Sequence, residues 1–376
     1  MKNKKIDYVF VYFNARKKRI NEGKDSPEEF FYGYQYIKNK GYEVAIVEFG
    51  GKVNPVINIL LNNFQKIFIK IFKFQYDFSG ILYKESLKTI KLSKSLILTN
   101  TRIGHSLIPY IIYNKLFKKD TEFSVFAMGM FNSSSNNKII LRIHKYLHSM
   151  LLYFIDNLIF IGQKEYKYAL EIFKNQKSKI KFLPFGIDNN FWNTKDEKKE
   201  GPILFIGNDS NRDFDFLEKL VNQLSNKKFI VVSEHTDGRF KNLENVEILK
   251  GSWNKNILDD ESIKNLYSQS KLTIIPLKNS LQPSGQSVAL QSMSMNTPVI
   301  ITQTDGFWDV ENFKHKENIY FIEKNKISDW AIAIEELEND EKIYQKIQIN
   351  AKSLIDQKFN TLEFGKNLFN IVGKIN

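Results

Sequence analysis

The sequence contains no cysteine among its 376 residues, so it can form neither a disulfide nor a thiolate metal site. Histidine is also scarce. There are only five, and none pairs with carboxylates at the spacing of a zinc site. These two absences predict a protein that works without a metal in a reducing compartment.

Long apolar runs are lacking as well. No stretch reaches the ~18 uncharged apolar residues of a membrane-spanning helix. The amino-terminal sequence MKNKKIDYVFVYFN has too short an apolar run for a signal peptide and no small-residue cleavage site. We therefore expect a cytoplasmic protein.

Acidic residues are in short supply only in the first half of the chain. Residues 1–199 carry 34 Lys and Arg against 17 Asp and Glu, a net charge of +17, whereas residues 200–376 carry 21 against 25, a net charge of −4. A basic half predicts an anionic partner, which could be nucleic acid, a membrane surface or a phosphorylated substrate. Nucleic acid is disfavoured because the lysines alternate with apolar stripes and no nucleic-acid-binding signature is present.

Two segments of the basic half, residues 54–74 and 138–154, place apolar residues at helical spacing beside basic ones. Their basic residues are Lys66, Lys70, Lys73, Lys138, Arg142 and Lys145. Such helices can lie in a membrane interface with their lysines toward anionic headgroups. The pattern also fits a helix that packs on a core and exposes a basic face. The protein is thus expected either to stay free in the cytoplasm or to bind the inner face of the cell membrane peripherally.

Strand and helix patterns alternate along the whole chain, which predicts parallel sheets with crossover helices, an α/β fold. A capping-box pattern at residues 26–29 predicts a helix that runs to about residue 38. Helices are also expected at 286–295 and 341–372. The expected strands cover residues 6–13, 42–49, 95–100, 122–128, 157–162, 179–186, 201–208, 227–234, 245–251, 271–277 and 297–303.

The polar segment NTKDEKKEGP (193–202) has the composition of a linker, and it divides the chain into two doubly wound units of similar size. In such sheets ligands bind at the carboxyl ends of the strands, and a helix that begins there offers backbone N–H groups to an anion. The second unit has two such places.

The first place is IGNDSNRD (206–213). Gly207 ends a strand, Asn208 follows it, and Arg212 precedes a helix, where a guanidinium can grip a phosphate with two hydrogen bonds. A tight turn with a surface arginine is the alternative.

The second place is QPSGQSVALQ (282–291), which follows a strand and opens a helix. Two serines there suit a helix N-cap, a glycine permits close approach, and a glutamine about two turns in could reach a sugar hydroxyl. The alternative is a capped core helix with a polar edge. The candidate donor-binding residues of this segment are Ser284, Gly285, Gln286, Ser287, Val288 and Gln291.

In their order and spacing, these motifs resemble the GT-B glycosyltransferases, most closely family 4, the group 1 set. PFGIDNNFW (184–192) resembles the interdomain segment written P-x-G-[VI]-D-x-x-x-F. ILFIGND and RDFDFL resemble the first strand and phosphate-contacting loop, and SGQSVALQSMSMNTPVIITQTDG resembles the signature helix and next strand. The segment EILKGSW through KLTIIPL resembles the part beside base and diphosphate, which adds Ser252 to the donor-binding candidates.

The resemblance implies two Rossmann-like domains facing a cleft. Residues 1–192 would bind the acceptor and residues 200–354 the donor, with a final helix at about 355–376 crossing back onto the first domain. The family signature has two glutamates separated by seven residues. Here Pro283 stands at the first position and Gln291 at the second.

The first half is less diagnostic. Family members often carry a histidine after the fourth strand, where this chain has Met128-Gly129-Met130. His105, in TNTRIGHSL, is then the candidate catalytic histidine, although a lone histidine is commonly structural. The candidates for the acceptor side follow the first strand and are Asn14, Arg16, Lys17 and Arg19.

The implied reaction is sugar transfer from a UDP- or GDP-sugar to a hydroxyl of a glycan or lipid-linked acceptor, in bacterial cell-surface glycan synthesis. The resemblance also implies retention at the anomeric carbon and no cofactor or metal. Two alternatives remain open. One is a GT-B sugar-nucleotide epimerase, which needs acid/base groups that the motifs do not supply. The other is a catalytically silent binding or scaffold protein, suggested by the missing glutamates.

Overall fold

The computed structural model describes residues 5–13, 16–21, 26–48, 55–77, 84–117, 120–132, 135–194, 200–251 and 257–373. The chain divides into two compact units. The first unit comprises Met1–Lys24, Phe30–Leu183 and Phe364–Asn376. The second comprises Asp25–Glu29 and Pro184–Glu363, so a short piece of the N-terminal half belongs with the C-terminal half. Much of the predicted linker, residues 195–199, lies outside the described residues.

The first unit is built on a six-stranded parallel sheet of order β2-β1-β3-β4-β5-β6. Its strands are rich in apolar residues because helices cover both faces of a parallel sheet, and Tyr8 to Tyr12 are fully buried. The strand order reverses between β1 and β3. The strands are β1 (Ile6–Tyr12), β2 (Val44–Glu48), β3 (Ser93–Leu98), β4 (Glu122–Ala127), β5 (Asn157–Phe160) and β6 (Ile180–Phe182).

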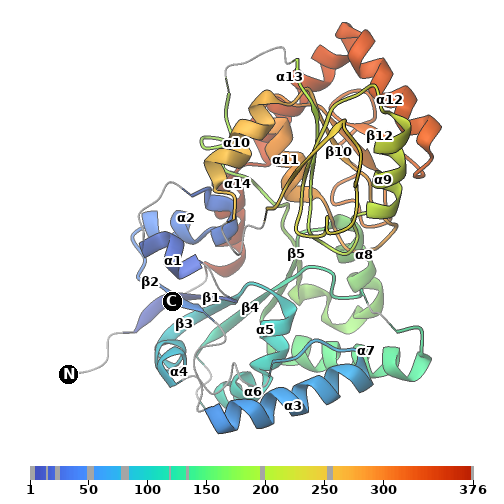
Figure 1. Ribbon diagram of the computed structural model, residues 1–376. Coiled ribbons are helices and arrows are strands. Elements are labelled where there is room, and N and C mark those ends of the chain that lie inside the picture. The colour runs from blue at the N-terminus through green and yellow to red at the C-terminus, as the bar shows by residue number, and fades with distance from the viewer. Residues whose placement is uncertain are drawn as a thin grey trace. The chain divides into compact units, whose positions relative to one another are not determined.

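Helices of the first unit lie on both faces of this sheet. In Figure 1, α3, α6 and α7 lie below the sheet and α2 lies above it. The helices are α1 (Arg16–Asn21), α2 (Tyr34–Asn39), α3 (Pro55–Phe72), α4 (Lys84–Lys91), α5 (Thr101–Ser106), α6 (Ile108–Phe117), α7 (Lys138–Phe154), α8 (Gln163–Ile172) and α14 (Thr361–Val372), with 3-10 segments at Glu28–Phe31 and Lys174–Lys179.

The second unit holds another six-stranded parallel sheet, of order β12-β11-β10-β7-β8-β9. Counted within the unit, this is the 3-2-1-4-5-6 order of a doubly wound nucleotide-binding fold. Its switch point lies between β7 and β10. The strands are β7 (Ile203–Ile206), β8 (Phe229–Val232), β9 (Val246–Leu249), β10 (Leu272–Ile275), β11 (Val299–Thr302) and β12 (Tyr320–Ile322), and the helices are α9 (Phe214–Gln223), α10 (Asp260–Gln269), α11 (Gln286–Ser294), α12 (Ile327–Asn339) and α13 (Glu341–Lys358).

The prediction of an α/β fold with two doubly wound units is confirmed, but two predicted helices are interrupted. The helix expected from residue 26 is broken by Tyr32 and Gly33, whose φ angles are +49° and +80°. The helix expected over 341–372 ends at Lys358. Asn360 then caps α14, because its Oδ1 accepts the N–H of Glu363 (2.9 Å).

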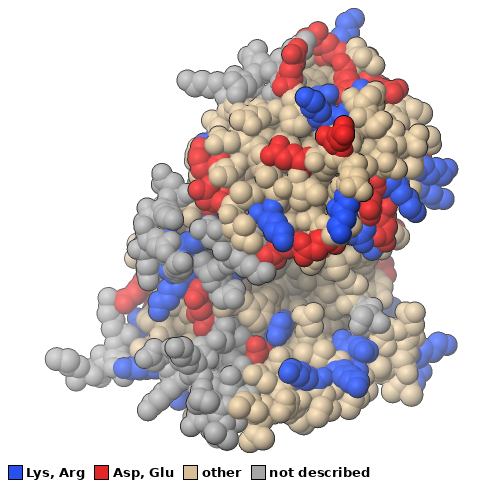
Figure 2. All heavy atoms as spheres, viewed as in Figure 1, with Lys and Arg blue, Asp and Glu red and all other residues tan. Residues whose placement is uncertain are grey.

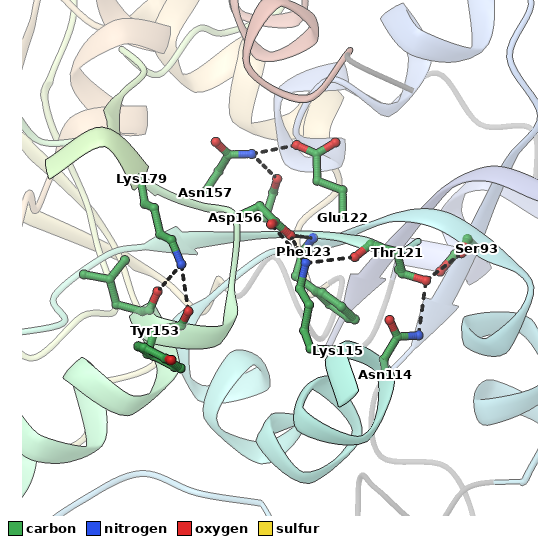
Figure 3. A network of polar contacts seen from close by, with 12 residues as sticks. Ser93, Asn114, Lys115, Thr121, Glu122, Phe123, Tyr153, Asp156, Asn157 and Lys179 are labelled. Atoms are coloured by element: carbon green, nitrogen blue, oxygen red, sulfur yellow. Dashed lines mark hydrogen bonds and ion pairs between the residues drawn. The ribbon is translucent and has the colours of Figure 1, made fainter. Parts of the chain in front are cut away.

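A polar network closes the amino-terminal edge of the first sheet (Figure 3). The Asp156 carboxylate accepts from the Lys115 ammonium (2.8 Å) and from the Phe123 N–H (2.8 Å). Asn157 Nδ2 donates to Glu122 (2.8 Å). These groups satisfy one another, so this edge is structural and the opposite edge, at the carboxyl ends of the strands, is left for ligands.

The two amphipathic segments of the basic half form α3 and α7. On α3, one stripe is more than half exposed, namely Ile59, Leu60, Phe64, Ile67 and Ile71. In Figure 2 an uncharged surface with Lys and Arg beside it covers the part of the unit where Figure 1 places α3 and α7. Among the described residues, no helix combines the length and apolar character needed to cross a membrane.

Candidate functional site

The site in the second unit is built at the switch point, where β7 and β10 run side by side and their connections leave in opposite directions. The loop after β7 is tied to the end of β10 by backbone hydrogen bonds. The Asp213 N–H donates to the Pro276 carbonyl (3.0 Å), and the Lys278 N–H donates to the Asn211 carbonyl (2.8 Å). The loops at 207–213 and 276–285 therefore form one surface at the carboxyl ends of the strands.

Arg212 is the charged centre of this surface. Its side chain is only 3% exposed, and the ion pair that it forms among the described residues is a long contact of 3.4 Å from Nη1 to Asp209. Within the described residues, Nε and Nη1 have no hydrogen-bond partner. Burial lowers the pKa of the guanidinium, because a charge is costly away from water. A buried cation with unused donors is a site for an anion.

The start of α11 lies against Arg212. A Cβ placed on Gly285 would be 3.0 Å from Arg212 Nη1, and Gly285 has φ +76°, a conformation that glycine adopts readily. Gly285 is also the N-cap, and no side chain caps the helix. The expectation that Ser284 or Ser287 would cap it is therefore wrong. Without a side-chain cap, the first turn of α11 directs its positive dipole end toward a ligand.

The other predicted residues of this place have distinct positions. Gln286, Ser287 and Val288 are the first three residues of α11. Ser284 is buried, and its Oγ accepts from Asn211 Nδ2 (2.8 Å), which links the two predicted places directly.

Gln291 lies deeper, with a side chain 5% exposed. Its Oε1 accepts from the Tyr267 hydroxyl (3.2 Å), and its Nε2 donates to Glu29 Oε1 (2.9 Å). Asn208 braces the loop around the site, because its Nδ2 donates to the Gly251 carbonyl (2.8 Å) and its Oδ1 accepts from Ser233 (3.0 Å).

The remaining donor-site candidate, Ser252, lies outside the described residues. Among the described residues, no group of three or more His, Cys, Asp or Glu side chains is arranged to hold a metal ion.

A cavity of about 1570 Å³ lies at the opposite, amino-terminal edge of the same sheet. Of its four lysines, Lys227 and Lys271 form ion pairs with Glu338 and Lys352 forms one with Asp356, which leaves Lys228. Because carboxylates already occupy the other three lysines, the cavity is a poorer anion site than Arg212 despite its size.

In the first unit, the candidates for the acceptor side lie after β1, next to the switch point between β1 and β3. The N–H groups of Arg16 and Lys17 donate to Glu48 Oε1 (2.7 and 2.8 Å), which caps α1. The Lys17 side chain is exposed, whereas Arg19 is 8% exposed. Asn14 lies outside the described residues.

His105 lies inside the core of the first unit and is 2% exposed. Its Nδ1 contacts the Thr101 carbonyl (2.6 Å) and its Nε2 contacts His148 Nδ1 (3.1 Å). Burial lowers the pKa of His105 to about 4. With both ring nitrogens engaged in the core, the geometry favours a structural role over the catalytic role expected from sequence.

Three residues of the site region were not predicted from sequence. Asn211 could have been found from its place beside Arg212, and Tyr267 from its place in a helix that precedes β10. Glu29 gave no usable signal, because it lies 262 residues from Gln291 in the chain.

Residues 187–354 match the family model described as "Glycosyl transferases group 1". No curated protein sequence matches the chain. The fold is similar to that of a glycosyltransferase from Rickettsia africae, with 16% identity, a TM-score of 0.64 and coverage of 99% of both chains.

It is also similar to Anabaena HepE in complex with UDP, with 12% identity, a TM-score of 0.66 and coverage of 98% of this chain and 100% of that one. A third similar structure is WaaG, a glycosyltransferase involved in lipopolysaccharide biosynthesis, with 11% identity, a TM-score of 0.61 and the same coverage. At these identities the similarity shows the fold, which is GT-B.

Proposed function

We propose that this chain, whose residues 187–354 are a glycosyl transferases group 1 domain, transfers a sugar from a nucleoside-diphosphate sugar to an acceptor hydroxyl. The observation that carries the proposal is the buried Arg212 guanidinium, with two nitrogens that have no hydrogen-bond partner among the described residues, against the uncapped start of α11. A diphosphate supplies the negative charge and the oxygen acceptors that this arrangement lacks.

In the reaction, the bond between the anomeric carbon and the diphosphate oxygen breaks, and the acceptor oxygen forms the new bond to that carbon. The nucleoside diphosphate leaves with the bonding electrons, and its departing phosphate oxygen takes up the proton of the acceptor hydroxyl. Arg212 and the α11 dipole would stabilise the charge that develops on the leaving diphosphate. This stabilisation supports a metal-independent transfer, and the family resemblance supports retention at the anomeric carbon.

The donor is proposed to be a UDP- or GDP-sugar. Structures of HepE hold UDP and UDP-glucose, which supports the first of these. Besides Arg212, the proposed donor-binding residues are Gly207, Asn208, Ser252, Ser284, Gly285, Gln286, Ser287, Val288 and Gln291.

The acceptor is proposed to be a glycan or a lipid-linked glycan that binds the first unit. The role of WaaG in lipopolysaccharide biosynthesis supports a place in bacterial cell-surface glycan synthesis. The net charge of +17 over residues 1–199 suits a lipid-linked phosphate or an anionic membrane. The exposed α3 stripe supports peripheral binding at the inner membrane face, because a solvent-exposed apolar surface is stabilised when a membrane buries it.

The test is calorimetric titration of the whole protein with UDP and GDP. Arg212→Ala should weaken binding by about 10- to 100-fold, since a charge-assisted hydrogen bond contributes roughly 1.5–3 kcal/mol. The control is Arg239→Ala, whose guanidinium pairs with Asp215 and Glu218 on the surface of the same unit. Equal affinity of Arg212→Ala and wild type would overturn the phosphate assignment.

A turnover assay distinguishes a glycosyltransferase from a scaffold protein and from an epimerase. The protein should release nucleoside diphosphate from a sugar nucleotide faster when a glycan acceptor is present. A scaffold would bind the sugar nucleotide without consuming it, and an epimerase would change the sugar while the nucleotide stays attached.

A further inference from the structure

Glu29 is a buried carboxylate that the N-terminal half of the chain contributes to the second unit. Its side chain is 2% exposed and receives three hydrogen bonds. Trp192 Nε1 and Gln291 Nε2 donate to Oε1 (2.6 and 2.9 Å), and the Asp188 N–H donates to Oε2 (3.0 Å). Within the described residues no Lys or Arg forms an ion pair with it. Burial of a carboxylate without a cation is costly, so the three hydrogen bonds hold its position.

The contact to Gln291 connects Glu29 with the proposed donor site. Gln291 lies on α11, whose first turn lies against Arg212. The Gln291 amide is held from both sides, because Nε2 donates to Glu29 while Oε1 accepts from Tyr267. Glu29 therefore fixes the orientation of the amide, with Nε2 toward Glu29 and Oε1 toward Tyr267.

Arg212 and Glu29 act on the same helix from two places. Both charges affect the pKa of the Tyr267 hydroxyl. Burial is the main cause that raises this pKa, the Arg212 charge lowers it, and the Glu29 charge raises it. A buried cation thus lies at the start of α11, and a buried carboxylate lies near its second turn.

We propose that Glu29 is a positioning residue of the donor site, whose ionised carboxylate orients the Gln291 amide for the nucleoside part of the donor. The proposal rests on the proposed function and deepens it, because it brings a residue from the N-terminal half into nucleotide recognition. An ionised carboxylate accepts from all three donors at once. A protonated one carries an O–H in place of one acceptor position, so one of the three donors loses its acceptor and the carboxyl holds the Gln291 amide less firmly.

Nucleotide binding should then depend on pH. Burial raises the pKa of Glu29 to about 7, against the opposing effect of its hydrogen bonds. The other ionisable groups around it are its chain neighbour Glu28, Asp188, whose N–H it accepts, and Tyr267, whose pKa it raises. Burial and the Asp188 charge raise the pKa of Glu28, which has no bond to Gln291 among the described residues.

The test measures the dissociation constants of UDP and of inorganic pyrophosphate by calorimetry between pH 6 and 8.5. Glu29→Gln should weaken UDP about tenfold at pH 8 and flatten its pH dependence, because an amide cannot accept three hydrogen bonds. Pyrophosphate, which needs only Arg212 and the α11 start, should bind as in wild type.

The control is Glu165→Gln in the first unit. Glu165 is also buried, and burial raises the pKa of its carboxyl to about 7, but it accepts from the backbone N–H of Gly129 (3.1 Å). This variant should keep the wild-type pH profile for UDP. Because UDP ionises in the same way in every titration, a difference between the two variants reports on the protein alone.

The same UDP affinity and pH profile in Glu29→Gln and wild type would overturn the inference. If wild type binds neither UDP nor GDP, the proposed function fails instead.

If Glu29→Gln does not fold, the Trp192→Phe variant tests the inference instead. It removes one donor to the carboxylate while keeping the Gln291 contact, so the midpoint of the UDP pH profile should move to higher pH. An unmoved midpoint in a folded Trp192→Phe protein would also reject the inference.

Discussion

The side chain of Arg212 lies directly over the backbone of Gly207, so closely that a Cβ at residue 207 would fall 2.1 Å from Arg212 Nε. A strand that ends in any other residue would push the guanidinium out of its buried place. The glycine after β7 is therefore required by the arginine five residues later.

Gly207→Ala should weaken UDP binding by displacing Arg212, whereas its cost in stability should be small, since Gly207 does not require a positive φ. Gly285→Ala should weaken binding too, and it should also lower the melting temperature, because alanine at φ +76° costs about 1 kcal/mol or more. Calorimetry and thermal unfolding of both variants check this. Wild-type affinity in Gly207→Ala would show that Arg212 does not need its present position.

Gln291→Ala should weaken UDP and a UDP-sugar by the same factor, because the proposed contact is to the ribose that both ligands share. Paired calorimetric titrations give the two factors. The matched control is Gln348→Ala on α13, a buried glutamine whose Nε2 donates to the Asn296 carbonyl (2.8 Å). A loss confined to the UDP-sugar would assign Gln291 to the transferred sugar instead.

The buried pair of His105 and His148 should make stability fall in mild acid. The unfolded His105 takes up a proton below about pH 6.5, whereas the folded side chain, with a pKa of about 4, stays neutral. The free energy of unfolding should thus decrease as pH falls from 6.5 to 4, by up to about 3 kcal/mol for this group, since one pKa unit corresponds to 1.36 kcal/mol.

Urea unfolding at pH 7.5, 6 and 5 should show a shallower pH dependence for His105→Gln than for wild type. His235→Gln, at an exposed histidine of the second unit, serves as the control. A folded His105→Gln protein should keep its turnover number. A large loss of turnover with intact stability would instead restore the catalytic role expected from sequence.

The α3 stripe should bring the protein to anionic vesicles and release it in high salt. Each lysine near an anionic leaflet contributes about 1 kcal/mol, and the attraction fades within a Debye length. Leu60→Asp and Ile67→Asp should reduce sedimentation with such vesicles. Ile349→Asp, at a side chain of the second unit that is 64% exposed, should not.

Equal binding to neutral and anionic vesicles, or none to either, would favour a soluble acceptor.

Most strands could be predicted because a parallel strand covered by helices on both faces consists mainly of consecutive apolar residues, as at 8–12 and 203–206. The strand β12 was missed because only three residues, YFI, form it. The breaks at Gly33 and at Asn360 depend on packing and capping that a helical pattern does not reveal.

The charged part of the site could be predicted because Arg212 and Gly285 occupy loops that directly follow strands. Glu29 could not, because the local pattern Ser26-Pro27-Glu28-Glu29 has every feature of a helix start. Its tertiary partners, Trp192 and Gln291, override that local preference. Contacts between residues so far apart follow from the fold alone.

The helix α14 completes the first unit with residues from the far end of the chain. Phe364, Leu368 and Val372 are buried there, and a Cβ on Gly365 would fall 2.4 Å from Tyr36 Cβ, so the two backbones pack closely. During synthesis the amino-terminal unit emerges first, yet it must wait for the last residues before its fold is closed. The second unit, which needs only residues 25–29 from earlier in the chain, can be complete before it. The unit that begins the chain therefore contains residues that are synthesised after those of the second unit.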